Sequence, residues 1–183
     1  MQKNILLITG SPRKKGNSNL LADAFTKGAQ SAGHTVTRFD SGTKLIGGCK
    51  ACDTCWSKGK ACSFSDGFDD LPALIEQADM LVICSPLYWF TFSAQLKAAL
   101  DRMYGYTTPQ CPKKLRIQEG ALLMCAAEPD AGVFAGPAAS YASLLKFMNW
   151  TDRGMVLVPG VYEKGDITKT DGLERAEKLG QSL

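Results

Sequence analysis

Four cysteines lie close together in the chain, at Cys49, Cys52, Cys55 and Cys62. Thiolate sulfurs at such short spacings can bind one iron–sulfur cluster from a single loop. The bacterial ferredoxin motif differs, because it has three residues before its last cysteine where this chain has six. Four-cysteine zinc sites are an alternative, although their ligands usually form two pairs that lie further apart. The remaining interpretation is a loop of free thiols, since cysteine tolerates burial without a metal.

A second group of side chains predicts an anion site between residues 10 and 19. This segment joins a short apolar run to a helical pattern, and backbone N–H groups at a helix N-terminus attract anions. Arg13 can add charge-assisted hydrogen bonds to a phosphate, and Ser11, Asn17 and Ser18 can add neutral ones. A Walker A loop needs lysine where Asn17 stands, and a dinucleotide fingerprint needs glycine where Pro12 stands. A plain polar turn is therefore the alternative to a monophosphate site.

A third group consists of three consecutive aromatic residues, Tyr88, Trp89 and Phe90, which follow another apolar run. Aromatic and apolar side chains line ligand pockets, while backbone groups fix the ligand's orientation. We expect Pro86 to restrain this turn and to present the N–H groups of Leu87 and Tyr88 toward a cleft. The alternative is that the aromatic side chains cover the sheet edge or a subunit contact.

The elements that must position these groups follow from the hydrophobic pattern. Strands are predicted at residues 5–9, 35–39, 80–84, 121–125 and 154–158. Helices are predicted at about residues 19–30, 70–78, 91–104, 137–148 and 171–179. Asn17 or Ser18 is placed to cap the first helix, and Asp69 and Asp70 to cap the second. Arg102 falls on the polar face of the third helix.

Strands that alternate with helices predict a parallel sheet with helices on both faces. The spacing suits an α/β fold with a doubly wound five-stranded sheet of order 2-1-3-4-5, in a single domain over residues 1–183. Ligands of this fold bind beyond the carboxyl ends of the strands, so the loops after residues 9, 85 and 125 should meet at one site. A phosphate at the first loop and a flat ring at the second describe FMN.

Several stretches of the chain carry a family resemblance. They are residues 10–13 with 16–18, 85–89, 95–98 with 101–102, 150 with 153–154, and 160–161 with 164–167. In them the chain resembles the NADPH-dependent FMN reductase family of flavodoxin-like proteins, in the branch that includes the iron–sulfur flavoproteins. The resemblance implies a flavodoxin-like fold and a homodimer or tetramer with FMN near the subunit contact.

The same resemblance implies which residues surround FMN. The phosphate would lie near Ser11, Arg13, Asn17, Ser18 and Asn19. The ring would lie against Pro86, Leu87, Tyr88, Trp89 and Phe90. The loop of Ala126, Ala127 and Glu128 would close the third side, although relatives often carry glycines there.

Three functions remain open. The first is an FMN-dependent oxidoreductase that takes a hydride from NAD(P)H and reduces a flavin, a quinone or a similar small-molecule acceptor. FMN performs that chemistry, so no catalytic side chain is expected. The second is an electron carrier in which Cys49, Cys52, Cys55 and Cys62 bind a 4Fe–4S cluster and a ferredoxin supplies electrons. The third is a flavin-free binding module. We favour the first, and we expect protein purified in air to carry FMN and little iron, with the cysteine loop covering part of the flavin cleft.

The composition excludes other classes. A net charge of +3 favours neither nucleic acid nor a membrane surface as partner, and no apolar run is long enough to span a bilayer. The single histidine, His34, rules out a histidine-rich metal site and is expected at the surface. Seven cysteines and no signal-peptide pattern indicate a reducing cytoplasm. Cys84, Cys111 and Cys125 are expected to be structural.

Overall fold

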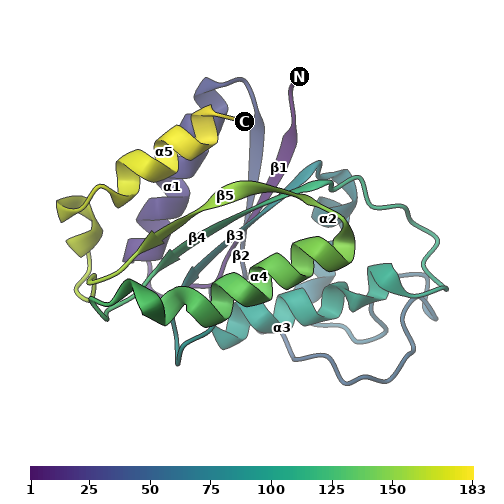
Figure 1. The fold of residues 1–183 in the computed structure, drawn as a ribbon. Coiled ribbons are helices and arrows are strands. Elements are labelled where there is room, and N and C mark those ends of the chain that lie inside the picture. The colour runs from purple at the N-terminus through teal and green to yellow at the C-terminus, as the bar shows by residue number, and fades with distance from the viewer.

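The computed structural model describes residues 1–183, and a five-stranded sheet lies at its centre (Figure 1). The strands are β1 (Asn4–Thr9), β2 (Thr35–Asp40), β3 (Met80–Pro86), β4 (Glu119–Cys125) and β5 (Thr151–Val158). All neighbouring strands are parallel, in the order β2-β1-β3-β4-β5, which confirms the predicted order. The three central strands are almost wholly buried, as continuous apolar runs require.

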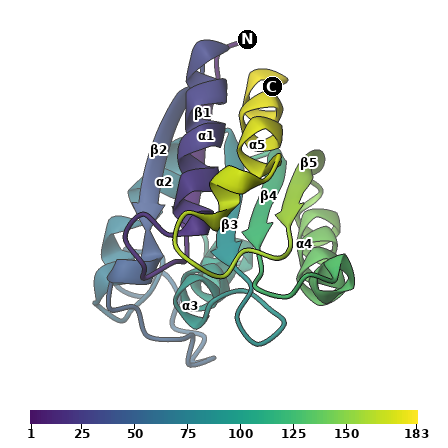
Figure 2. The same ribbon diagram turned by 90° about the vertical axis from the view of Figure 1, so that its left-hand side faces the viewer.

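Helices cover both faces of this sheet. The helices α1 (Asn17–Ser31) and α5 (Gly172–Gln181) lie side by side over one face (Figure 2). The other face carries α2 (Pro72–Gln77), α3 (Ala94–Arg102) and α4 (Ala135–Met148). A separate hydrophobic core fills each side, because alternate residues of every strand point to opposite faces. No helix combines the length and the apolar character that crossing a membrane requires.

The start of α1 differs from the sequence prediction. The helix begins at Asn17, Gly16 is its N-cap, and no side chain caps it. The predicted capping by Asn17 or Ser18 is therefore wrong. Both residues lie inside the first turn, and the Asn17 side chain bonds to a distant loop instead.

The starts of α2 and α3 also differ. Asp69 and Asp70 belong to a short 3₁₀ helix that ends before α2 begins at Pro72, so they do not cap α2. The helix α3 starts at Ala94, three residues later than predicted, because Ser93 caps it by accepting a hydrogen bond from a backbone N–H. The residues before Ser93 form a tight turn instead of helix.

His34 is not the surface residue that the sequence indicated. It is 8% exposed, and its Nδ1 accepts a hydrogen bond from the backbone N–H of Lys3, 3.2 Å away. Burial and then the positive charge of Lys3 lower the pKa of His34 below its ordinary value. The imidazole therefore joins the turn before β2 to the start of β1 in its neutral form.

Candidate functional site

The carboxyl ends of the central strands border a cleft of about 210 Å³. Nine of the predicted cofactor-binding residues line it: Ser11, Arg13, Asn17, Ser18, Pro86, Leu87, Tyr88, Ala126 and Ala127. Four others lie outside its lining: Asn19, Trp89, Phe90 and Glu128. The cleft also has five lining residues that were not among the predicted cofactor-binding residues: Gly16, Cys125, Val161, Tyr162 and Lys164.

The first loop is folded by its own polar groups. The carbonyl oxygen of Arg13 accepts hydrogen bonds from the Gly16 N–H at 3.0 Å and from the Asn19 side-chain amide at 2.9 Å. The Ser11 hydroxyl oxygen accepts one from the Arg13 N–H at 3.2 Å. Asn19 therefore supports the loop from behind instead of facing the cleft. The guanidinium of Arg13 has no partner within the chain, so it is free to bind an anion.

Two glycines let this loop sit against its neighbours. A Cβ atom at Gly10 would lie 2.3 Å from the Ser93 hydroxyl oxygen, at the start of α3. A Cβ atom at Gly42 would lie 2.4 Å from the carbonyl oxygen of Ser11. Both distances are too short for a real side chain, so glycine is required where the first loop meets α3 and the segment after β2.

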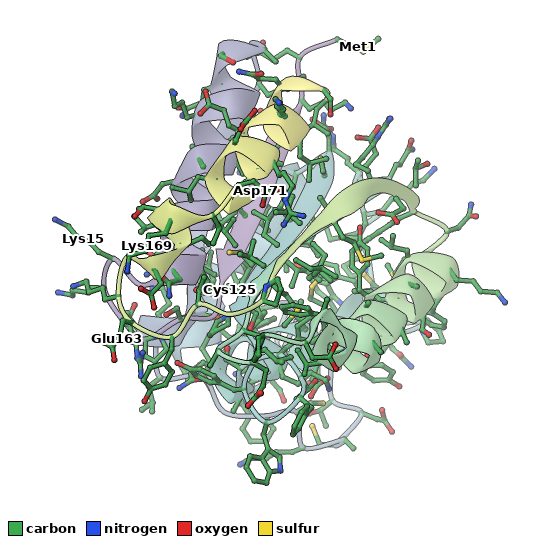
Figure 3. All side chains as sticks on the ribbon, turned by 60° about the vertical axis from the view of Figure 1, so that its left-hand side comes forward. Met1, Lys15, Cys125, Glu163, Lys169 and Asp171 are labelled. Atoms are coloured by element: carbon green, nitrogen blue, oxygen red, sulfur yellow. The ribbon has the colours of Figure 1, made fainter.

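Asn17 fastens a loop from the other end of the chain onto the cleft. Its side-chain amide donates to the carbonyl oxygen of Glu163 at 2.9 Å, and its oxygen accepts from the N–H groups of Gly165 and Ile167. Figure 3 shows Glu163 and Lys15 on the same side of the molecule, away from Met1. The β5–α5 loop thereby brings Tyr162 and Lys164 to the cleft, although nearly 150 residues separate them from Asn17.

The second loop has a different backbone arrangement from the predicted one. The N–H of Leu87 donates to the carbonyl oxygen of Cys125 at 2.7 Å, and the N–H of Tyr88 donates to that of Thr91 at 3.0 Å. Neither N–H group is free to bind a ligand. The prediction that the N–H groups of Leu87 and Tyr88 are presented toward the cleft is therefore wrong. Pro86 and the side chains of Leu87 and Tyr88 form an apolar wall instead.

Trp89 and Phe90 occupy the two central positions of a tight turn between Tyr88 and Thr91. Their φ angles are 47° and 62°, in the left-handed region that bulky residues avoid. Their side chains are 93% and 60% exposed. Two strained and exposed aromatic residues at the rim of a cleft indicate a functional or contact role, because packing within the chain does not require them.

Replacing this pair by the sequence that the turn favours should stabilise the protein. The double variant Trp89→Asn/Phe90→Gly should raise the free energy of unfolding by about 1–2 kcal/mol, since Asn-Gly adopts positive φ at little cost. Urea unfolding monitored by far-UV circular dichroism measures the change. The matched control is Phe147→Gln, which removes an aromatic side chain that is 74% exposed but helical. An unchanged midpoint in the double variant, equal to that of the control, would show that the turn stores no strain.

The third loop closes the cleft on the β4 side. The N–H of Ala126 donates to Val158 and its carbonyl oxygen accepts from Val161, so that this backbone is tied to the end of β5. Ala127 follows with its backbone outside these bonds, and the carbonyl oxygen of Glu128 accepts from the N–H of Gly160 at 2.8 Å. The apolar floor beside this loop includes Cys125, whose pKa burial raises to about 12, so its thiol stays neutral at physiological pH.

The charged side chains of the cleft are all basic. Arg13 and Lys164 line it, and no aspartate or glutamate does. The cleft therefore combines positive charge and a helix N-terminus at one end with an apolar wall at the other. This is the arrangement that a phosphorylated, flat heterocycle requires.

The cysteine loop forms a second cavity of about 240 Å³. Cys49, Cys52, Cys55 and Cys62 all line it, but no three of the chain's histidine, cysteine, aspartate or glutamate side chains are arranged to hold a metal ion. The two cavities have no lining residue in common, so the prediction that this loop covers the flavin cleft is wrong. The reason is that the loop packs on the C-terminal end of α3, whereas the cleft adjoins its start. The nine residues of α3 span about 13 Å at 1.5 Å per residue.

Residues 3–161 match the family described as NADPH-dependent FMN reductase. The chain belongs to this family. Among curated relatives, the iron–sulfur flavoprotein of Archaeoglobus fulgidus is 38% identical over 99 residues, which are 54% of this chain and 44% of that protein. The iron–sulfur flavoprotein of Methanosarcina thermophila is 30% identical over 52% of this chain and 49% of its own length. This FMN reductase family member thus spans about half the length of the curated relatives it matches.

Solved structures resemble this FMN reductase family member over nearly its whole length. The NAD(P)H:quinone oxidoreductase from Methanothermobacter marburgensis superposes with a TM-score of 0.79 at 20% identity, over 100% of this chain and 96% of that one. An FMN-dependent NADH-azoreductase from Bacillus anthracis, in complex with FMN, superposes with a TM-score of 0.69 at 13% identity, over 99% of both chains. Together with the strand order, this likeness confirms the predicted flavodoxin-like fold.

Proposed function

We propose that this chain is an FMN-dependent oxidoreductase that takes a hydride from NAD(P)H and reduces a quinone, a flavin or a similar small acceptor. One observation carries the proposal: an unpartnered arginine at a helix N-terminus and an apolar wall face the same cleft. Membership of the FMN reductase family supports it. The named activities of the quinone oxidoreductase and the azoreductase are of the same class.

The residues of the cleft would bind and orient the cofactor. Ser11, Arg13 and Ser18 would hold the phosphate, while Leu87 and Tyr88 would lie against the ring. Bound FMN supplies a flat ring that accepts and returns a hydride, so the chain contributes position and electrostatics. The absence of carboxylates from the cleft lining favours binding of an anionic nicotinamide nucleotide beside the flavin.

The basic residues of the first loop give a direct test. Arg13→Ala should weaken FMN binding by about 1.5–3 kcal/mol, the range for a hydrogen bond to a charged group. Lys14→Ala is the matched control, because Lys14 lies outside the cleft, beside a separate polar groove, and should leave the affinity nearly unchanged. Fluorescence titration of apoprotein with FMN measures both. If Lys14→Ala has the larger effect, the phosphate lies on the other side of the loop and the assigned site is incorrect.

A second function is supported by the cysteine cavity and by the names of the curated relatives. In it the chain is an electron carrier that uses FMN and a 4Fe–4S cluster. Four thiols around one cavity fit the donor set that such a cluster needs, although they are not arranged for coordination here. Cys49, Cys52, Cys55 and Cys62 would hold the cluster, which would supply one-electron transfer.

Iron content separates the two functions. Protein reconstituted without oxygen from iron and sulfide should contain about four irons per chain if the cluster forms. Replacing one of the four cysteines by alanine should lower the iron content and leave FMN in place, because the two cavities share no residue. Reconstituted protein that binds FMN but no iron would leave the plain reductase as the function.

We further propose a homodimer or tetramer located in the cytoplasm, with a ferredoxin as an electron donor in the cluster form. The outer face of α4 supports the oligomer, since Lys146 is the one charged residue of this helix and Phe147 is exposed. Trp89 and Phe90 add apolar surface near the N-terminal end of α4. Seven cysteines without a disulfide are compatible with a reducing compartment.

A further inference from the structure

The last residue of α3 is a buried arginine. Arg102 is 4% exposed, and its Nη1 lies 2.6 Å from both carboxylate oxygens of Asp66. Its Nη2 donates to the carbonyl oxygen of Phe64 at 3.0 Å, and its guanidinium lies over the ring of Phe68. The sequence pattern placed this residue on a polar helix face, but the cysteine loop covers it.

Asp66 ties the ends of that loop to the arginine. Its carboxylate accepts hydrogen bonds from the N–H of Gly47 at 3.0 Å and from the N–H of Phe68 at 2.9 Å. The chain therefore enters and leaves the segment of residues 47–66 at one ion pair. Figure 1 shows this segment below α3. Both ends of the segment are thus held at Asp66 and Arg102, and the four cysteines between them line one cavity together with the arginine.

One atom of this arrangement has no partner. The Nε of Arg102 is the one buried side-chain nitrogen or oxygen of the chain that makes no hydrogen bond. A buried donor left unsatisfied costs about 1–3 kcal/mol, and more when the group is charged. Native proteins satisfy such groups unless a ligand, an ion or a function accounts for them.

The surroundings of this atom indicate its partner. Arg102 lines the cysteine cavity, whose two carboxylates are engaged: Asp66 with Arg102 itself, and Asp53 with the hydroxyl of Tyr104. Burial lowers the pKa of the Arg102 guanidinium, whereas Asp66 and then Cys62 raise it above its ordinary value, and no other thiol of the cavity contributes. A sulfur that carries negative charge beside Nε would supply the missing acceptor.

We propose that Arg102 is a positioning residue whose Nε–H donates a hydrogen bond to the sulfur of Cys62 when that sulfur is a ligand of a metal–sulfur cluster. The inference rests on the cluster form of the proposed function. Asp66 holds the guanidinium in place, so that the donor is already oriented before the cluster binds. A hydrogen bond to a ligand sulfur stabilises the negative charge of the reduced cluster, and it therefore raises the reduction potential.

Replacing Arg102 by lysine distinguishes the effect of the Nε hydrogen bond from the effect of the positive charge. Arg102→Lys keeps a positive group for Asp66 but lacks the planar fork that places Nε. After anaerobic reconstitution, this variant should have a cluster of lower reduction potential than wild type, measured by redox titration. An iron chelator should also remove its iron at least tenfold faster. Arg116→Lys is the matched control, because Arg116 pairs with Asp79 at the surface, far from the cavity lining. It should match wild type in both measurements.

Flavin binding reports whether each variant is folded, since the flavin cleft shares no residue with the cysteine cavity. If Arg102→Lys does not bind FMN, Asp66→Asn serves instead, with iron release as its readout: it loosens the guanidinium and should speed the release, whereas its lost negative charge would itself shift the potential. Equal potentials and equal iron release in wild type and the folded variant would overturn the inference and leave the cluster function intact. Wild-type protein that takes up no iron would overturn both.

Discussion

FMN should bind this chain at least a hundredfold more tightly than riboflavin, which lacks only the phosphate. The Arg13 guanidinium and the helix N-terminus at Asn17 face the cleft without a compensating acid. Two charge-assisted hydrogen bonds to the phosphate, at about 1.5–3 kcal/mol each, amount to about 3–6 kcal/mol. Since about 1.4 kcal/mol is a factor of ten in affinity, the expected ratio lies between about one hundred and ten thousand.

Separate titrations with the two flavins provide the measurement. Apoprotein is titrated with each flavin, and the quenching of flavin fluorescence gives the two dissociation constants. The Arg13→Ala variant is the control, because it should weaken FMN binding and leave riboflavin binding unchanged. Equal affinities of wild type for FMN and riboflavin would mean that the first loop does not bind phosphate, whatever holds the ring.

The sheet could be predicted from the sequence because burial determines its pattern. The strands β1, β3 and β4 are buried on both faces, which demands continuous apolar runs, and their order follows from the alternation of strands and helices. The place of the first loop at the cleft was also predictable, since a loop between a parallel strand and the next helix lies at the carboxyl edge of the sheet. Local signals fail where a contact joins distant segments, as for the burial of His34 against Lys3.

Local sequence signals also fail for the backbone of the second loop, which follows β3. Nothing local indicates that Trp89 and Phe90 adopt positive φ, because turns of this kind favour asparagine and glycine. Within the turn that they form, the N–H of Tyr88 donates a hydrogen bond to Thr91. The N–H of Leu87 donates to the end of β4. The apolar character of the loop was therefore predictable, whereas its hydrogen-bonding capacity was not.

The residues around the cysteines were only half predictable. Their spacing correctly indicated that four thiols share one place in the fold. Arg102 was assigned to solvent, because a helical pattern reveals which face of a helix is polar but not which loop will cover it. Tyr162 and Lys164 were missed in the flavin cleft for a related reason. Their loop reaches the cleft through Asn17, a contact that no local pattern encodes.

Loss of the contact between Asn17 and the β5–α5 loop should strongly affect both stability and FMN binding. Asn17→Ala should lower the free energy of unfolding by about 2–4 kcal/mol, because it removes three hydrogen bonds and leaves the buried N–H of Ile167 unsatisfied. It should also weaken FMN binding at least tenfold, since the loop that carries Lys164 is released from the cleft. Urea unfolding and fluorescence titration measure the two quantities. Gln30→Ala is the matched control, an exposed amide of the same helix without a side-chain partner, and it should change neither.

The aspartate variant separates the structural role of Asn17 from its place beside the phosphate. Asn17→Asp keeps the oxygen that accepts from Gly165 and Ile167 but sets a second acceptor oxygen against the Glu163 carbonyl, so it should cost about 1–2 kcal/mol of stability, less than the alanine variant. Its negative charge would nevertheless lie in the lining of the cleft, where repulsion should weaken FMN binding by at least as much as the alanine variant does. A variant that is nearly as stable as wild type but binds FMN poorly would place the phosphate at the start of α1. If Asn17→Asp binds FMN as wild type does, the phosphate does not lie there, and Asn17 serves only to hold the β5–α5 loop.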